Sequence, residues 1–156
     1  MKAQNYGYSK KVIEVFKSPK NIGEIANPDG FGKVGNPKCG DLMYMYLRIS
    51  KDGKDRIDDI KIKTFGCLGA ISSSSILTEM VKGMTIEKAL KVTKDQVVKE
   101  LDGLPPIKIH CSVLSVDALK ESVYNYYKKS KKKIPKDFEA THKRNVQICE
   151  GIEHMH

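Results

Sequence analysis

Three cysteines stand where the sequence favours metal or thiol chemistry. A glycine lies within two residues of Cys39 and of Cys67, and Cys111 follows His110 directly at an expected helix start. Glycine allows the backbone to approach a bound ion closely, and a helix N-terminus stabilises a thiolate. We therefore interpret the three cysteines as one site. Three thiolates suit either tetrahedral zinc or an iron–sulfur cluster, and the spacing alone leaves both open.

Two neighbours of these cysteines are candidates for a fourth ligand. His110 offers an imidazole beside Cys111. Asp41 lies two residues after Cys39, and residues two apart on an extended segment point to the same side. The alternatives are that His110 is a hydrogen-bonded core histidine and that Asp41 caps a turn. The sequence thus predicts three thiol ligands and a choice of two for the fourth position.

The remaining cysteine and histidines fall late in the chain. For Cys149 we expect either a small buried hydrophobic side chain or an exposed thiol. We expect His142, His154 and His156 to be solvated. The predicted site therefore includes none of the four.

Size and composition indicate a single domain that can bury its own core. The chain has 156 residues, of which 40% are hydrophobic and 30% charged. No apolar run approaches the roughly 20 residues that cross a bilayer, and the first residues lack the apolar segment of a secretory signal. We therefore expect a cytoplasmic protein, with no membrane partner. Thiols stay reduced there, which favours metal binding or thiol chemistry over a disulfide framework.

The formal net charge is +9, and much of the excess lies late in the chain. Six lysines fall within nine residues: Lys128, Lys129, Lys131, Lys132, Lys133 and Lys136. We interpret them as a solvated helix end, because cations favour helix C-termini. The alternative is attraction of nucleic acid or of an acidic protein. Because zinc-finger spacing and RNP-like aromatic motifs are absent from the sequence, we expect no specific nucleic-acid partner.

Local patterns divide the chain into strands followed by helices. A first helix over 8–17 ends at Pro19, because proline cannot continue a helix. Strands are expected over 31–34, 41–50 and 57–65, with a short edge strand first and a period-two alternation in the last. This order predicts an antiparallel meander.

After residue 65 the hydrophobic period becomes helical. Helices are expected over 70–82, 85–90, 93–101, 111–129 and, within a polar tail, 137–152. Thr93 and Gln96 have the spacing of a capping box, and Ser112 is a candidate cap for the longest helix. The serines at 72–75 are expected to allow close helix packing rather than to form a linker. Strands first and helices after predict an α+β fold.

Three segments resemble the signature segments of a known family. They are Asn36–Asp41, Thr64–Ala70 and Leu104–Ser112, and they resemble those of IscU and of the N-terminal domain of NifU, the iron–sulfur cluster assembly scaffolds. The likeness runs over about 8–129. It implies a small antiparallel three-stranded sheet with helices packed against it. The chain would then comprise a scaffold domain over 1–130 and a basic, polar C-terminal extension over 131–156.

The resemblance also implies roles for individual residues. Cys39, Cys67 and Cys111 would be cluster ligands and sulfur acceptors. Asp41 would tune how readily the cluster is lost, and His110 would be a candidate ligand. A DnaK-type chaperone with its co-chaperone would read the segment Leu104, Pro105, Pro106, Ile107 and Lys108, in which Ile107 stands where valine is common.

The implied function is assembly rather than stand-alone catalysis. A cysteine desulfurase would deliver sulfur, iron would be added, and a [2Fe–2S] cluster would pass to apo iron–sulfur proteins. The protein would be a monomer or weak homo-oligomer, and zinc could occupy the site after purification. A zinc-bound SufU-like sulfur acceptor ranks second, because such proteins usually carry an insertion between the first two cysteines and lack the histidine that His110 supplies here. A basic nucleic-acid-binding protein ranks last.

Overall fold

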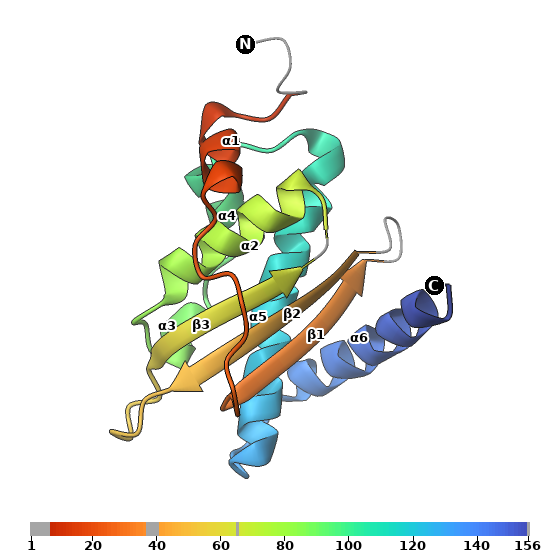
Figure 1. Cartoon of the computed structure of the whole chain (residues 1–156). Helices are drawn as coiled ribbons and strands as arrows, with labels where there is room; N and C mark the ends of the chain where they lie inside the picture. The colour runs from red at the N-terminus through yellow and green to blue at the C-terminus, as the bar shows by residue number, and fades with distance from the viewer. Residues whose placement is uncertain (1–6, 37–40, 65, 156) are drawn as a thin grey trace.

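Three strands form an antiparallel sheet in the order β1–β2–β3 (Figure 1). They are β1 (Gly30–Asn36), β2 (Asp41–Ile49) and β3 (Ile57–Thr64). The computed structural model describes residues 7–36, 41–64 and 66–155 and, for Asn36, Asp41, Ile107 and 152–155, only the backbone. Alternate side chains of β2, including Met43, Met45 and Leu47, are fully buried, so one face of the sheet forms the core.

Helices pack against that buried face, against the edge strand β1 and against one another. They are α1 (Lys10–Lys17), α2 (Leu68–Val81), α3 (Ile86–Ala89), α4 (Lys94–Glu100), the 3₁₀ turn η1 (Pro106–Lys108), α5 (Ile109–Lys129) and α6 (Lys136–Met155). The long helix α5 packs on β1 and β2, and α2 packs on β3 and α5. The predicted α+β fold, with a small three-stranded antiparallel sheet and helices against it, is confirmed. None of the described helices is long and apolar enough to cross a bilayer.

Two glycines bring β1 and α5 into backbone contact. A Cβ atom at Gly32 would lie 2.6 Å from the amide nitrogen of Ser122 and 2.7 Å from the carbonyl oxygen of Ala118. A Cβ atom at Gly30 would lie 2.5 Å from the carbonyl oxygen of Ser122. No larger residue fits either position without separating the helix from the strand. These glycines therefore set the distance between the sheet and its longest helix.

The serine run at 72–75 lies inside α2 rather than in a linker and is fully buried, and its hydroxyls hydrogen-bond to neighbouring segments. The Ser72 hydroxyl donates to the carbonyl of Val12 in α1, and the Ser73 hydroxyl donates to the carbonyl of Cys111 in α5. The Ser75 hydroxyl accepts from the amide of Lys20 and donates to its carbonyl. Small side chains with local acceptors thus let α2 pack closely on three sides.

The start of α5 differs from its prediction. The helix begins at Ile109, and the Ser112 hydroxyl donates to the carbonyl of Ile109 inside the first turn, so Ser112 is not the cap. The preceding 3₁₀ turn begins at Pro106, whose fixed φ suits the first position of a helix. This turn carries the backbone into helical geometry two residues earlier than expected. His110 and Cys111 therefore lie within the first turn of α5.

The predicted final helix is present as α6, and it lies beside β1 and α5 (Figure 1). The prediction that His142 is solvated is wrong. Its ring stacks on Tyr124 at 4.2 Å, and its Nδ1 hydrogen-bonds to the buried carboxylate of Glu121. Burial raises the pKa of Glu121, against the lowering effect of His142. The prediction for His154 and His156 lies outside the described side chains.

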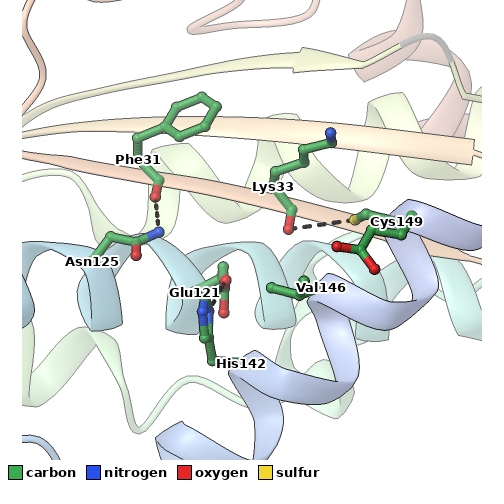
Figure 2. A pocket seen from close by; sticks show the side chains of 8 residues that line it. Phe31, Lys33, Glu121, Asn125, His142, Val146 and Cys149 are labelled. Carbon is green, nitrogen blue, oxygen red and sulfur yellow. Dashed lines mark hydrogen bonds and ion pairs between the residues drawn. The ribbon is translucent and has the colours of Figure 1, made fainter. Parts of the chain in front are cut away.

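Cys149 is buried, which agrees with the first of its two predicted alternatives, a small buried hydrophobic side chain. Its thiol donates to the carbonyl of Lys33 on the edge of the sheet, at 3.7 Å. A pocket of about 350 Å³ lies between α6, α5 and this edge (Figure 2). It is lined by Glu121, His142 and Cys149, among others, and by none of the site residues predicted from the sequence.

Candidate metal centre

Cys67 and Cys111 meet at the N-termini of the two main helices. Cys67 is the N-cap residue of α2, with extended backbone, and Cys111 lies in the first turn of α5. Their sulfur atoms are 3.5 Å apart. Two of the three cysteines that the sequence grouped are therefore brought together, although 44 positions separate them in the chain.

A glycine makes this approach possible. A Cβ atom at Gly69 would lie 3.3 Å from the sulfur of Cys111 and 3.6 Å from Cβ of Lys108. The first turn of α2 therefore lies directly against the first turn of α5. Gly69 thus permits close approach of two helices, whereas the expected approach of the backbone to a bound ion stays a prediction.

The surroundings favour a thiolate on Cys67. Its pKa is lowered to about 5, chiefly by a hydrogen bond from the thiol of Cys111, and further by the backbone amides of Ala70 and Gly69 and the charge of Lys108. Burial opposes this shift. Cys149 shows the contrast, because burial raises the pKa of its thiol. Cys67 is thus the nucleophilic sulfur of the pair at neutral pH.

Tyr8 closes the site from the N-terminal side. Burial raises the pKa of Tyr8, the charge of Cys67 raises it further, and its hydroxyl accepts a hydrogen bond from the backbone amide of Gly69. The preceding residue, Gly7, adjoins the ring of Pro105, since a Cβ atom at Gly7 would lie 3.6 Å from Cγ of that proline. Sequence reasoning assigned no role to Tyr8, since a buried tyrosine near a helix start is indistinguishable from an ordinary core residue.

The remaining predicted ligands are not brought together by the described residues. Cys39 lies outside them, and Asp41 begins β2 opposite Asn36 with no side chain described. His110 is partly buried in the first turn of α5. Within the described part of the chain, no three His, Cys, Asp or Glu side chains are grouped to hold a metal ion. The roles of Cys39, Asp41 and His110 therefore stay predictions.

The thiol pair nevertheless has the geometry of two ligands of one metal. Zinc–sulfur bonds of about 2.3 Å at a tetrahedral centre place two sulfur atoms about 3.8 Å apart. The observed separation of 3.5 Å between Cys67 and Cys111 is close to this value. The donor set suits soft metals such as zinc and iron in clusters.

The segment expected to bind a chaperone borders this site. Leu104 packs against the core, and Pro106–Lys108 forms the 3₁₀ turn that leads into α5. Pro106 is exposed, and the Lys108 charge reaches Cys67. The segment is therefore continuous with the thiol site, and its recognition by a chaperone stays a prediction.

The chain belongs to the family described as the NifU-like N-terminal domain, whose model matches residues 7–133. It is 53% identical over 125 residues to iron–sulfur cluster assembly scaffold protein IscU 1 of Archaeoglobus fulgidus, covering 80% of each chain. It is 42% identical over 125 residues to the scaffold protein IscU of Aquifex aeolicus, covering 80% of this chain and 79% of that protein. The mitochondrial iron–sulfur cluster assembly protein 1 of Schizosaccharomyces pombe is 50% identical over 125 residues, covering 78% and 64%.

Solved structures share the fold. A protein described as an iron–sulfur cluster assembly scaffold of the SUF system, from Fervidobacterium islandicum AW-1, matches with a TM-score of 0.64 at 21% identity, over 77% of this chain and 98% of that one. The N-terminal part of a NifU-like protein from Brucella abortus matches with a TM-score of 0.61 at 23% identity, over 78% and 94%. At these identities the likeness establishes the fold alone.

Proposed function

We propose that this protein is a scaffold on which an iron–sulfur cluster is assembled and from which it is passed to apo-proteins. The observation that carries the proposal is the Cys67–Cys111 pair, with sulfur atoms 3.5 Å apart at two helix N-termini. Relatives that share 42–53% identity over most of the chain are named as scaffolds of this kind. The cluster is the cargo of the reaction rather than a resident cofactor.

The first chemical step is sulfur transfer. The thiolate of Cys67 attacks the terminal sulfur of a persulfide carried by a cysteine desulfurase. A new sulfur–sulfur bond forms on the scaffold, the old one breaks, and the desulfurase thiolate leaves. The low pKa of Cys67 supports this assignment, because the thiolate is the attacking species. Cys39 and Cys111 are the further acceptors.

The complete ligand set consists of Cys39, Cys67 and Cys111, with Asp41 and His110 as oxygen and nitrogen donors. We assign a [2Fe–2S] cluster to it, with zinc as an occupant of the purified protein. A centre with three thiolates and one weaker ligand holds iron yet releases it more readily than four thiolates would. The protein therefore acts as a carrier rather than as a stand-alone enzyme.

The partners follow from this role. A cysteine desulfurase supplies sulfur, and apo iron–sulfur proteins receive the cluster. A DnaK-type chaperone with its co-chaperone would read Leu104–Lys108, next to Cys111. We further propose that residues 1–130 form the scaffold domain, as a monomer or weak homo-oligomer, and that 131–156 is an addition to it. The family model supports this division because it ends at residue 133.

Anaerobic reconstitution tests the proposal. The protein is mixed with a desulfurase, cysteine and ferrous iron, then followed by visible absorption, metal analysis and mass spectrometry. We expect persulfide on Cys39, Cys67 or Cys111 and then an iron–sulfur chromophore, with Cys149→Ala behaving like wild type. Tightly held zinc that iron and sulfide do not displace, together with faster desulfurase turnover, would instead establish the SufU-like sulfur acceptor.

A further inference from the structure

The solvent-facing side of the sheet carries a regular array of aromatic rings and lysines. The strand register pairs Phe31 with Tyr46 and Tyr46 with Lys61 in one row. In the next row it pairs Lys33 with Tyr44 and Tyr44 with Lys63. Because side chains alternate along a strand, all six point to the same face. We call these residues, Phe31, Lys33, Tyr44, Tyr46, Lys61 and Lys63, the outer-face patch.

Helices leave this face uncovered. α2 and α5 pack against the opposite face, and α6 lies beside β1 at the sheet edge (Figure 1). The close-up shows the ring of Phe31 and the side chain of Lys33 leaving β1 on the side away from α5 and α6 (Figure 2). Phe31 is 36% exposed. Phe31 and Lys33 also line the pocket beside α6, so the patch adjoins that pocket along β1.

The three rings form a cluster of their own. The ring centroids of Phe31 and Tyr44 are 6.1 Å apart, and those of Phe31 and Tyr46 are 5.2 Å apart. Such cross-strand pairs stabilise a sheet. Polar side chains alone would suffice on the solvated face of an antiparallel sheet, however. An aromatic centre with charged residues around it has instead the composition of a protein-binding surface.

The positive charge of the patch indicates what kind of protein could bind there. Three lysines surround the rings. The carboxylate of Glu24 contacts Lys63 at 2.8 Å, and Asp59, two residues before Lys61 on β3, pairs with Lys82 at 3.4 Å. The chain as a whole carries +9. The complementary surface is therefore acidic. Single-stranded nucleic acid fits less well. The planes of the Phe31 and Tyr44 rings lie 25° apart and the rings stack on each other, so these ring faces are turned toward each other rather than toward bases.

The patch lies next to the thiol site. Lys63 precedes Cys67 by four residues, a stretch of chain that spans at most about 14 Å. Tyr44 follows the start of β2 at Asp41 by three residues. We propose that the outer-face patch docks an acidic protein that receives the assembled cluster. This inference rests on the proposed function and adds the surface and the charge of the recipient.

A binding experiment with metal-free protein tests the docking directly. The probe is an acidic apo-ferredoxin of the [2Fe–2S] class, titrated by calorimetry. Tyr44→Ala and Lys61→Glu should each weaken binding by about tenfold, as expected for residues central to an interface. The matched control is Lys91→Glu, an exposed lysine after α3 that lies outside the patch. It should change affinity by less than about twofold, and circular dichroism checks that every variant is folded.

The same variants, loaded with cluster, should transfer it to the apo-ferredoxin more slowly while assembling it at the wild-type rate. If Lys61→Glu and Lys91→Glu weaken binding equally, only net charge matters and the patch is not the docking surface. Tighter, Tyr44-dependent binding of a single-stranded oligonucleotide of about 12 nucleotides would also overturn the proposal. Wild-type protein that forms no chromophore would contradict the proposed function, whereas normal assembly with unaffected transfer by the variants would contradict the docking alone.

Discussion

At the scale of single residues, the Cys67 thiol differs sharply from the Cys149 thiol. Cys67 has a pKa of about 5, whereas burial raises the pKa of Cys149. At about pH 6 the metal-free protein should therefore react with iodoacetamide faster at Cys67 than at Cys149. Cys111→Ala removes the hydrogen bond that chiefly lowers this pKa, so it should slow labelling of Cys67 several-fold at that pH. Peptide mass spectrometry over time measures both rates.

Two results would contradict this electrostatic account. The first is labelling of Cys149 as fast as that of Cys67 in the folded protein. The second is an unchanged rate at Cys67 in Cys111→Ala. A lowered pKa means that the folded state favours the thiolate. Above about pH 9 the Cys67 thiol ionises in both wild type and Cys111→Ala. The two proteins should therefore label at Cys67 at the same rate in that pH range.

Asp41 provides a second test at this scale. A hard carboxylate matches poorly with a centre otherwise ligated by sulfur, so it should loosen the cluster more than it holds it. Asp41→Ala should therefore lengthen the lifetime of cluster absorbance under chelator in air. Cys111→Ala should abolish stable binding, because it removes one thiolate.

The alternative role of Asp41 predicts a different outcome. If Asp41 only caps the turn into β2, its replacement by alanine should cost about 1 kcal/mol of stability and leave the cluster lifetime unchanged. Loss of cluster as fast as in wild type, or faster, would rule out a loosening role. Urea unfolding of the metal-free variant separates the two effects.

At the scale of elements, the contact between β1 and α5 depends on glycine. Gly32→Ala would force a Cβ atom to within 2.6 Å of the backbone of α5. We expect a loss of about 2–3 kcal/mol in the free energy of unfolding, typical of an overpacked core. Gly151→Ala in α6 is the control, since a Cβ atom there meets nothing within 4 Å. It should stabilise the protein by up to about 1 kcal/mol through helix propensity, and equal effects of the two changes would refute the packing argument.

The docking of α6 depends on a polar cluster. His142→Ala would remove the imidazole partner of the Glu121 carboxylate, which is only 5% exposed, and leave it the longer hydrogen bond from Asn145 at 3.5 Å. It would also remove the ring that stacks on Tyr124. We expect a loss of about 2 kcal/mol in stability and faster proteolysis in the segment before α6. Lys143→Ala, an exposed neighbour, should change stability by less than about 0.5 kcal/mol. An unchanged proteolysis rate in His142→Ala would show that α6 is held by other contacts.

Element type was predictable where the local pattern was regular. The alternation of Ile60 and Ile62 with lysines predicted β3, and the spacing of Thr93 and Gln96 predicted the capping box that opens α4. The start of α5 was misplaced because a 3₁₀ turn carries no hydrophobic period of its own. The burial of His142 depends on α5, about 20 residues away in sequence, and no local rule contains that information.

At the scale of the whole molecule, the site is a product of topology. The sequence grouped Cys67 with Cys111 through their similar settings, and the fold brings them together because α2 and α5 begin at the same place. Gly69, in the first turn of α2, lets the first turn of α5 lie against it, and Tyr8 joins the site from the segment before α1. Only the tertiary structure could reveal these two contacts. Residue type and the expected helix starts therefore predicted the thiol pair. The contacts that shift the pKa of Cys67 could be found only from the packing of the folded chain.

The positions of the late lysines bear on whether the protein can bind nucleic acid. Part of the late lysine cluster is occupied within the protein. Lys132 pairs with the carboxylate of Asp55, and the Lys129 ammonium donates to the carbonyl of Pro28 at 3.3 Å. These contacts support the interpretation of the cluster as a helix end that also ties α5 to neighbouring loops. They reduce the number of cations available to phosphates.

We therefore predict that DNA and RNA bind only weakly and without sequence preference. Each phosphate contact releases counterions, so binding of this type weakens steeply with salt and should be lost by roughly 200 mM. Replacing Lys128, Lys131 and Lys133 with glutamine should flatten the salt dependence, whereas Tyr44→Ala should leave it unchanged. Fluorescence anisotropy with labelled oligonucleotides at several salt concentrations measures both. Nanomolar, sequence-specific binding at physiological salt would contradict the interpretation, because a helix end of exposed lysines offers no fixed donor pattern with which to read bases.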